Sequence, residues 1–268
     1  MSSQCLDPFP DRVCVGRRAF SYIGDSARNL KFLGHSDPRA PDSGCTMGQV
    51  KFGPYIGRDF YRRPCLEVAA EMVGLILVRR MADGQLLAGQ IVEVEAYLGG
   101  GQDPASHAQR GETPRNRSMF GPPGRLYVYR SYGIHDCANL VCEPTGTGAA
   151  VLLRAVEPLV GIEQMRRNRS LAKGSVPKLI AAGPGRLTQA FAIGPELDGR
   201  AVARGQPVAL RRPPPQLEGL AITRCPRIGI SKAVSRPYRF CANDNRYLSK
   251  PIPKQRTRST HPTPRSGG

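Results

Sequence analysis

The sequence lacks the patterns that identify many metal, redox and nucleotide sites. It contains no CxxC pair, no GxGxxG or Walker motif and no internal repeat. Its eight cysteines are not accompanied by a matching pair of histidines, and four histidines leave little material for a metal site. Neither a zinc site nor a redox dithiol is therefore predicted, and the cysteines are expected to be small buried or incidental thiols.

Long apolar runs are also missing. No stretch approaches the roughly 18 apolar residues that a membrane-spanning helix needs. The first residues, MSSQCLDPFPDR, do not show the charged and then apolar segments of a secretory signal. We therefore expect a soluble, intracellular protein without a membrane partner. Its expected location is the cytoplasm, in association with the nucleoid in a prokaryote, or the nucleus in a eukaryote.

Acidic residues are scarce relative to basic ones. The 268-residue chain has 39 Lys and Arg against 21 Asp and Glu, which gives a formal net charge of +18. Such an imbalance suits a polyanionic partner, either nucleic acid or an anionic membrane surface. Because hydrophobic residues still make up 40% of the chain, it can bury a substantial core. The composition thus favours a folded protein that acts near nucleic acid.

Composition divides the chain into three parts. Residues 1–50 are rich in Gly, Pro, Ser and Asp without a sustained period, and they are predicted to be a disordered or loosely attached extension. Residues 51–245 carry patterned sequence and are expected to form one domain. Residues 246–268 have several basic side chains and no acidic one. They are predicted to be a basic disordered tail that strengthens nonspecific phosphate binding.

The patterned part is predicted to contain hairpin-linked strands and a few helices, which is an α+β domain. Apolar residues at period two or near 3.6 distinguish the strands from the helices. The predicted elements are a helix after Pro64, a hairpin over residues 76–99 with its turn at Asp83 and Gly84, a second hairpin that turns at Gly133, a strand over 149–158, helices over 161–169 and 183–193, and one or two strands within 222–234.

Two carboxylates lie inside the apolar strand GQIVEVEAYLGG, residues 89–100. Because side chains alternate along a strand, Glu93, Glu95 and Tyr97 share one face. A solvent-exposed polar face is the ordinary explanation, but the strand leads into a Gly-rich loop and Arg154 is embedded in another apolar strand. A carboxylate and a guanidinium buried in strands are costly unless they are paired or functional. The two groups predict a water held between a general base and a cation.

Tyrosines form a second group, in RLYVYRSYG. Tyr127 and Tyr129 share a strand face, and burial in the core is the ordinary explanation for Tyr127. Tyr132 stands beside the expected hairpin tip at Gly133, where a side chain is exposed. An exposed aromatic ring at the tip of a hairpin is suited to insertion into a stack of bases.

His107, Asn139 and a basic loop complete the candidate site. Taken singly, His107 is an ordinary surface or structural histidine, and the arginines belong to a solvated loop. Taken together, these residues predict a pocket with groups that bind base edges, flanked by arginines that bind phosphates. The candidate phosphate-binding arginines are Arg115, Arg117 and Arg125.

The order of these motifs resembles the alkyladenine (3-methyladenine) DNA glycosylase family, which are monofunctional alkylpurine DNA glycosylases. EAYLG, TPRNRSMF, LYVYRSYG and LLRA follow one another, AAGPGRLTQAFAI and RIGI come after them, and the match covers residues 58–239. The resemblance implies a single α+β domain with a curved, mainly antiparallel β-sheet, packed helices and a protruding β-hairpin. It further implies a monomer that acts on double-stranded DNA containing damaged purines, with no cofactor and no metal.

The resemblance also implies an activity and assigns its residues. The enzyme would flip an alkylated purine out of the duplex and hydrolyse the N-glycosidic bond, which leaves an abasic site for base excision repair. Glu95 corresponds to the general base that deprotonates the water attacking C1′, and Arg154 to the arginine that helps to hold this water. Glu93 receives no catalytic role. Tyr132 corresponds to the tyrosine that is inserted where the nucleotide leaves.

The remaining matched residues belong to the base pocket. Tyr97, Tyr129 and His107 would stack on or hydrogen-bond the flipped base, and Asn139 would disfavour guanine through its exocyclic amine. Two other functions stay open from the residues alone. A non-catalytic damaged-DNA-binding protein with a tyrosine wedge would have no need of Glu95, and an RNA-binding or nucleoside-hydrolysing enzyme would reuse the pocket.

Overall fold

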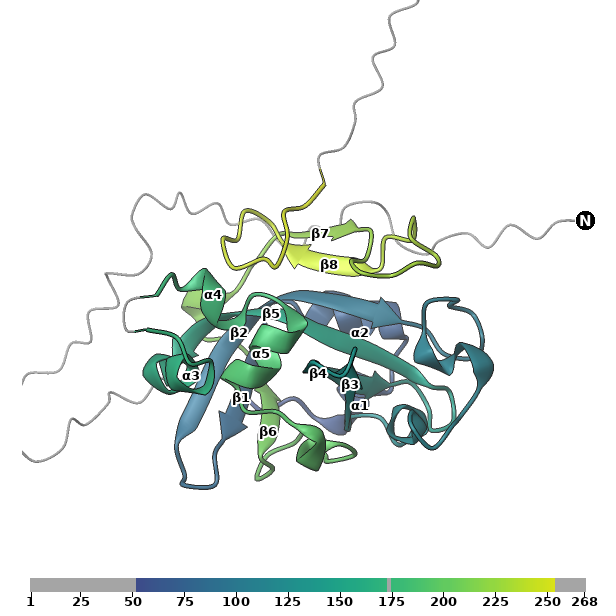
Figure 1. Cartoon of the computed structure of the whole chain (residues 1–268), viewed down its shortest axis with the longest axis horizontal. Helices are drawn as coiled ribbons and strands as arrows, with labels where there is room; N and C mark the ends of the chain where they lie inside the picture. The colour runs from purple at the N-terminus through teal and green to yellow at the C-terminus, as the bar shows by residue number, and fades with distance from the viewer. Residues whose placement is uncertain (1–51, 173–174, 254–268) are drawn as a thin grey trace, which may run out of the picture.

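The computed structural model describes residues 52–172 and 175–253 (Figure 1). Within this part of the chain, eight strands form one sheet, and its paired strands run antiparallel. Their order is β3-β4-β5-β2-β1-β6, with β8 beside β2 and β7 beside β8. The strands are β1 (Ile76–Arg80), β2 (Leu86–Tyr97), β3 (Leu126–Ser131), β4 (His135–Cys142), β5 (Ala149–Val160), β6 (Val208–Arg211), β7 (Ile222–Cys225) and β8 (Arg239–Ala242).

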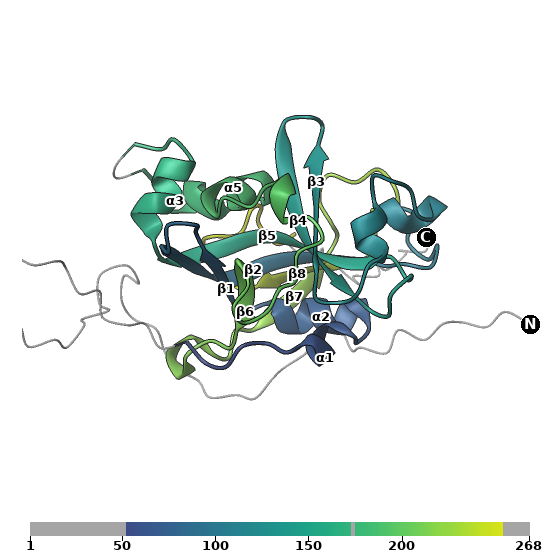
Figure 2. The same ribbon diagram turned by 90° about the horizontal axis from the view of Figure 1, so that it is seen from below.

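Short helices flank the sheet, so the α+β expectation is confirmed. Figure 2 shows α3 and α5 on one side of the sheet and α2 on the other. The α-helices are α1 (Arg58–Tyr61), α2 (Cys65–Met72), α3 (Ile162–Asn168), α4 (Lys178–Ala181) and α5 (Pro184–Ala190), and the 3₁₀ helices are η1 (His107–Arg110), η2 (Arg117–Phe120), η3 (Pro195–Leu197) and η4 (Pro215–Leu217). None of the described helices is long and apolar enough to cross a membrane.

Two predicted hairpins are present. In the β1–β2 hairpin, Gly84 has a φ of 84° and the Asp83 carboxylate accepts a hydrogen bond from the amide of Gln85 at 2.9 Å. The β3–β4 hairpin extends away from the sheet on the side of α5 (Figure 2). At its tip Tyr132 and Gly133 have φ values of 49° and 71°. A left-handed conformation is unusual for tyrosine, and the residue that adopts it here is exposed at the tip.

Alternation along β2 separates the core from the candidate site. Val94 and Ala96 are fully buried in the main apolar cluster, while Glu93, Glu95 and Tyr97 project from the other face. Both faces of the strand are covered, because β2 is buried from Leu87 to Ala96. The carboxylates are therefore held inside the protein and not on a solvated surface.

Arg154 lies at a β-bulge, on the same sheet face as the carboxylates, because Leu152, two residues earlier, pairs with Glu95. In the register between β2 and β5, Val94 pairs with Leu153 and Glu93 pairs with Ala155, so Arg154 has no direct partner. Bulges of this kind change the direction of a side chain. The carbonyl of Arg154 accepts a hydrogen bond from the amide of Gly183 at 2.8 Å, which ties the bulge to the start of α5.

Two short strands, β6 and β8, were not predicted from the sequence. β8 could not be recognised, because its four residues begin with a buried arginine and show no alternation of polar and apolar side chains. The final strands expected within residues 222–234 amount to β7 alone, and residues 226–234 form a loop. This loop approaches the candidate site, as described below.

The prediction that a disordered tail begins at residue 246 is wrong for residues 246–253. Tyr247 and Leu248 are buried in the main apolar cluster, and the amide of Ser249 donates to Glu93 at 2.6 Å. Two adjacent apolar residues within a basic segment show no hydrophobic periodicity. A prediction from composition therefore could not identify this segment as packed. The N-terminal extension, residues 1–50, and the rest of the tail lie outside the described residues.

Packing of the C-terminal segment predicts a stability effect. We expect Leu248→Ala to lower the free energy of unfolding by about 2–5 kcal/mol, because the substitution removes buried methyl groups and leaves a cavity. Urea denaturation measures this change. Val234→Ala is the control, since Val234 is 53% exposed, and its effect should stay within about 0.5 kcal/mol. Equal effects of the two substitutions would show that the segment is not packed in solution.

Candidate active site

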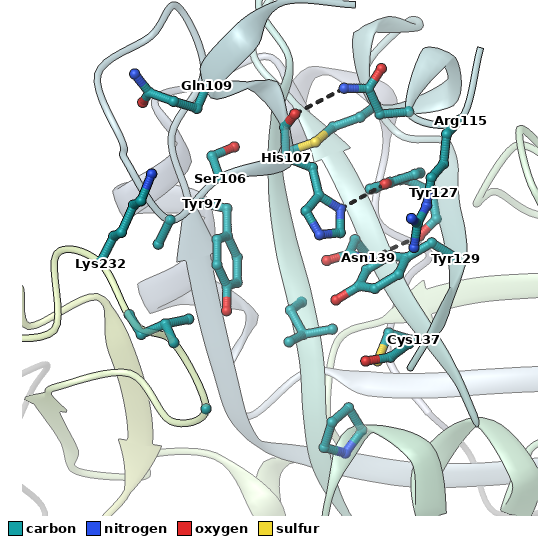
Figure 3. A pocket seen from close by; sticks show the side chains of 18 of the residues that line it. Tyr97, Ser106, His107, Gln109, Arg115, Tyr127, Tyr129, Cys137, Asn139 and Lys232 are labelled. Atoms are coloured by element: carbon teal, nitrogen blue, oxygen red, sulfur yellow. Dashed lines mark hydrogen bonds between the residues drawn. The ribbon is translucent and has the colours of Figure 1, made fainter. Parts of the chain in front are cut away.

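A pocket of about 950 Å³ opens over the sheet face that carries Tyr97 (Figure 3). Its walls come from β2, β3, β4 and β5, from the loop that contains η1, and from residues 228–232 after β7. Because side chains alternate along each strand, neighbouring strands contribute every second residue to one face. Tyr129, Cys137, Asn139, Leu152 and Arg154 line the pocket for this reason.

Aromatic rings form the walls. Figure 3 shows Tyr97 on one side and His107 with Tyr129 on the other. The His107 and Tyr129 rings meet edge to face with centroids 4.5 Å apart, and Tyr127 stacks on Tyr129 at 5.4 Å. Tyr127 is buried as predicted, yet it also contributes to the lining of the pocket. A flat ring would fit between these walls and meet π faces and edges.

The tyrosine hydroxyls are held as neutral hydrogen-bond donors. Burial raises the pKa of Tyr127 to about 12, and burial first, with smaller contributions from neighbouring groups, raises the pKa of Tyr97 and of Tyr129 further. The Tyr127 hydroxyl lies 2.9 Å from Nδ1 of His107. Each phenol therefore presents an O–H group and not a phenolate at physiological pH.

Glu95 lies beneath the pocket and accepts three hydrogen bonds. Its Oε2 accepts from the Tyr97 hydroxyl at 2.9 Å and from Arg154 Nη1 at 3.2 Å, and its Oε1 accepts from the amide of Ile228 at 2.7 Å. Glu95 is fully buried, whereas Tyr97 and Arg154 both line the pocket. The predicted pairing of Glu95 with Arg154 is therefore present, and Glu95 lies behind these two side chains, outside the lining of the pocket.

Glu93 accepts hydrogen bonds from a second group of donors. Arg154 Nε and Arg239 Nε each lie 2.9 Å from its Oε1. Burial opposes ionisation of Glu93, but the charges of Arg154 and Arg239 outweigh burial and lower its pKa. In the same way, burial disfavours the charge of Arg154, while Glu95 and Glu93 outweigh burial and raise its pKa. Glu93, Arg154 and Arg239 are therefore charged in the folded protein.

Arg227 is a site residue that the sequence analysis did not single out. Its guanidinium forms a buried ion pair with Asp103, with nitrogen–oxygen distances of 2.5 and 2.8 Å, and lies 4.6 Å from the centroid of the Tyr97 ring. It also donates to the carbonyl of Ala96 at 2.9 Å. Arg227 thus fixes the ring of Tyr97, and the amide of the next residue binds Glu95. The only available signal was the RIGI motif itself.

Asn139 and His107 carry polar atoms into the pocket. Asn139 pairs with Tyr127 across β3 and β4, and its Nδ2 donates to the Tyr127 carbonyl at 3.0 Å. This hydrogen bond is what is expected of an asparagine that supports strand pairing. Asn139 also lines the pocket, as is expected of an asparagine that contacts a base. Burial, and then the charge of Arg115, lower the pKa of His107, so its imidazole is neutral near pH 7.

The three arginines predicted to bind phosphates lie in different places. Among the described residues, the lining includes Arg115 but neither Arg117 nor Arg125. Arg117 forms an exposed ion pair with Glu112 at 3.5 Å. Arg125 donates to the Gly199 carbonyl at 2.7 Å and precedes β3, at the opposite end of the strand from the hairpin tip. Phosphate binding by these residues stays a prediction, and only Arg115 is next to the pocket.

Tyr132 is exposed at the tip of the β3–β4 hairpin, at the rim of the pocket. Its side chain is 86% exposed, and that of Ile134 is 77% exposed. Tyr132 also belongs to the lining of the pocket. Two large apolar side chains in water at one hairpin tip are more typical of a contact surface than of a surface that stays solvated.

Comparison with known proteins agrees with this arrangement. A family model described as Methylpurine-DNA glycosylase (MPG) matches residues 59–246, which is most of the chain. The chain therefore belongs to the methylpurine-DNA glycosylase family, and the resemblance inferred from the motifs is confirmed. The matched range includes β8, which the motif comparison had reached only in part.

Similar proteins occur in bacteria and archaea. Relatives from Agrobacterium fabrum and Methanoculleus marisnigri are 48% identical over 206 residues and 46% identical over 193 residues. These alignments cover 76% and 71% of this chain, and 98% and 96% of the relatives. A relative from Rhodopseudomonas palustris is 45% identical over 217 residues, covering 81% of this chain and 97% of its own. Each bears the name "Putative 3-methyladenine DNA glycosylase".

The surroundings of His107 predict its titration. We expect its imidazole to titrate below the ordinary value of about 6.5, because burial and Arg115 both disfavour the protonated form. Arg115→Gln should raise the midpoint without restoring the ordinary value, since burial remains. Proton NMR of the imidazole resonances measures the titration midpoint of His107 in the wild-type protein and in Arg115→Gln. The His107→Asn variant assigns the signal. An unchanged midpoint in Arg115→Gln would show that Arg115 does not act on this ring in solution.

Proposed function

We propose that this protein is a DNA repair glycosylase that hydrolyses the N-glycosidic bond of alkylated purines of the 3-methyladenine type. It flips the damaged nucleotide out of duplex DNA and leaves an abasic site for base excision repair. Family membership and the names of the relatives support this function. The observation that carries it is the pair of Glu95 and Arg154 beneath an aromatic pocket, because hydrolysis needs a base and a water at the inner end of the site that receives the nucleobase.

The reaction requires little beyond what these residues provide. An alkylated purine is cationic and already a good leaving group, and stacking on Tyr97 and Tyr129 would stabilise it by about 0.5–2 kcal/mol through cation–π interaction. Glu95 takes a proton from the attacking water, while Arg154 orients this water. The carboxylate charge also stabilises the oxocarbenium-like sugar as the glycosidic bond breaks. No lysine Schiff base is involved, so the product is an intact abasic site.

Polar groups in the pocket select the base. When the Tyr127 hydroxyl donates to Nδ1 of His107, the proton of the neutral imidazole resides on Nε2, which can donate to an acceptor on a purine edge. This donor would assist neutral lesions, which need help for the leaving group. Asn139 restricts the space available to an exocyclic amine and so disfavours guanine.

Tyr132 fills the gap that the flipped nucleotide leaves in the stack, and Arg115 binds a neighbouring phosphate. The protein acts as a monomer in the cytoplasm, in contact with the nucleoid in a prokaryote, or in the nucleus in a eukaryote. A damaged-DNA-binding protein without catalysis is the alternative. It is disfavoured because a binding module has no use for a fully buried carboxylate and a cation beneath the base pocket.

Replacing the general base tests the chemistry. Glu95→Gln is expected to lower the single-turnover rate of excision by at least about 10²-fold, because an amide cannot accept the proton of the attacking water. Affinity for damaged DNA should stay within a few-fold of wild type. Alkylated duplex DNA is incubated with excess protein, and abasic sites are then cleaved with alkali.

Glu71→Gln serves as the control for this substitution, since Glu71 pairs with Arg63 on the surface and is not part of the pocket. It should excise at the wild-type rate. Rapid excision by Glu95→Gln would remove Glu95 from the role of general base. Binding of damaged DNA without any excision by the wild-type protein would favour the non-catalytic alternative.

The hairpin tip and the basic C-terminus are proposed to contribute to DNA affinity through different interactions, the first by inserting a ring into the base stack and the second by binding phosphates. Tyr132→Ser should shorten the lifetime of the flipped complex and leave affinity for undamaged DNA almost unchanged, because the ring acts only in the gap. Deleting residues 254–268 should weaken binding to all duplexes and flatten its salt dependence, because fewer counterions are released. Fluorescence of a duplex containing ethenoadenine reports flipping, and titrations at several salt concentrations report the slope.

Equal losses on damaged and undamaged DNA after Tyr132→Ser, with an unchanged flipping signal, would exclude the wedge. The deletion starts at residue 254 because the preceding segment packs against the core through Tyr247 and Leu248.

A further inference from the structure

Glu93 is the centre of a buried hydrogen-bond network that joins three distant parts of the chain. Its Oε1 accepts from Arg154 Nε and Arg239 Nε at 2.9 Å each, and from Ser249 Oγ at 2.7 Å. Its Oε2 accepts from the amide of Ser249 at 2.6 Å. Arg239 Nη2 also donates to the carbonyl of Lys250 at 2.5 Å. β2, β5, β8 and the C-terminal segment therefore meet at one carboxylate.

The network restrains each side of the Arg154 guanidinium. Nε is bound by Glu93, Nη1 by Glu95 at 3.2 Å, and Nη2 contacts Ser249 Oγ at 3.4 Å. Because the guanidinium is planar, contacts at three nitrogens fix the position and the tilt of the whole group. Arg154 is only 7% exposed, and this small exposed part faces the pocket.

We propose that Glu93 is a positioning residue for hydrolysis, and that Arg239 and Ser249 hold it in place. This inference rests on the proposed function, since it acts through Arg154. Glu93 occupies Nε and Ser249 occupies Nη2, so Nη1 is the nitrogen that binds Glu95, and a two-nitrogen contact between Arg154 and Glu95 is disfavoured. Glu95 thus binds the arginine through Nη1, and among the described contacts the second N–H of Nη1, the second N–H of Nη2 and one acceptor position of the Glu95 carboxylate remain for a water.

Removal of the Glu93 charge would change this geometry. Arg154 and Arg239 would then share one buried counterion, Glu95, and an arginine freed at Nε forms a bidentate pair with a carboxylate. In Glu93→Gln the side-chain NH₂ would in addition face donors, whichever oxygen it replaces. Glu95 would be enclosed by Arg154, and the water would lose its place between them.

The test compares excision with binding in single variants. Glu93→Gln is expected to slow single-turnover excision by roughly 100-fold, as displacements of about 1 Å do in other active sites. Ser249→Ala, which removes the hydroxyl between Glu93 and Arg154, should slow it less. Affinity for alkylated duplex DNA and the ethenoadenine flipping signal should stay at wild-type values in both variants, because neither residue lines the described pocket.

A double-mutant cycle separates positioning from general stability. If Glu93 acts through Arg154, then Glu93→Gln and Ser249→Ala should cost nothing further in an Arg154→Ala background. Thr188→Ala is the matched control for Ser249→Ala. Thr188 is a buried hydroxyl that donates within α5 and to the Asp136 carbonyl, away from Arg154, and its loss should leave the rate unchanged.

Two results would overturn the proposal. One is excision at the wild-type rate by both Glu93→Gln and Ser249→Ala. The other is that these two substitutions lower the excision rate equally in the wild-type and Arg154→Ala backgrounds. If Glu93→Gln does not fold, the two Ser249→Ala measurements decide the question alone. The wild-type protein and Glu95→Gln, measured in the same assay, distinguish failure of the proposed function from failure of the positioning role. If the wild-type protein does not excise, the proposed function is wrong. If only Glu95→Gln excises normally, Glu95 is not the general base. Normal excision by both Glu93→Gln and Ser249→Ala removes only the positioning role.

Discussion

The fold and the candidate site depend on one set of buried ion pairs. Glu93 and Glu95 on β2 face Arg154 on β5 and Arg239 on β8, and the four charges cancel inside the protein. Burying such charges is costly, and loss of one partner leaves another uncompensated. The network is therefore stable only when β2, β5, β8 and the C-terminal segment are all in place. Pairing of these strands therefore also brings together the groups of the candidate site.

This dependence explains how short elements come to matter. β8 has four residues, and the C-terminal segment has no regular structure, yet both supply hydrogen bonds to Glu93. The loop after β7 acts similarly, since Arg227 fixes the Tyr97 ring and the Ile228 amide binds Glu95. Long strands thus present the candidate catalytic groups, and short segments nearer the end of the chain contact these groups.

The sequence predicted the parts of the site that follow from periodicity. Alternation placed Glu93, Glu95 and Tyr97 on one face, and the turn at Gly133 placed Tyr132 at an exposed tip. Pairing of Glu95 with Arg154 followed from the cost of burying either alone. The contacts of Arg239 and Ser249 could not be predicted, because single residues in short segments have no period and their partners are more than 140 residues away. The bulge at Arg154 is likewise a property of register, which one strand's sequence does not specify.

The net charge of the whole chain differs from the local charge beside the pocket, and this contrast bears on the choice of substrate under the proposed function. The whole chain has a net charge of +18, which attracts the phosphates of any duplex. Beside the pocket, however, Arg154 and Arg239 are compensated by Glu93 and Glu95, and Arg227 by Asp103. The aromatic walls add neutral π faces. On the proposed function, a cationic purine would pass from the basic surface into this compensated interior, where stacking would stabilise its charge, while an undamaged neutral base would gain no cation–π interaction.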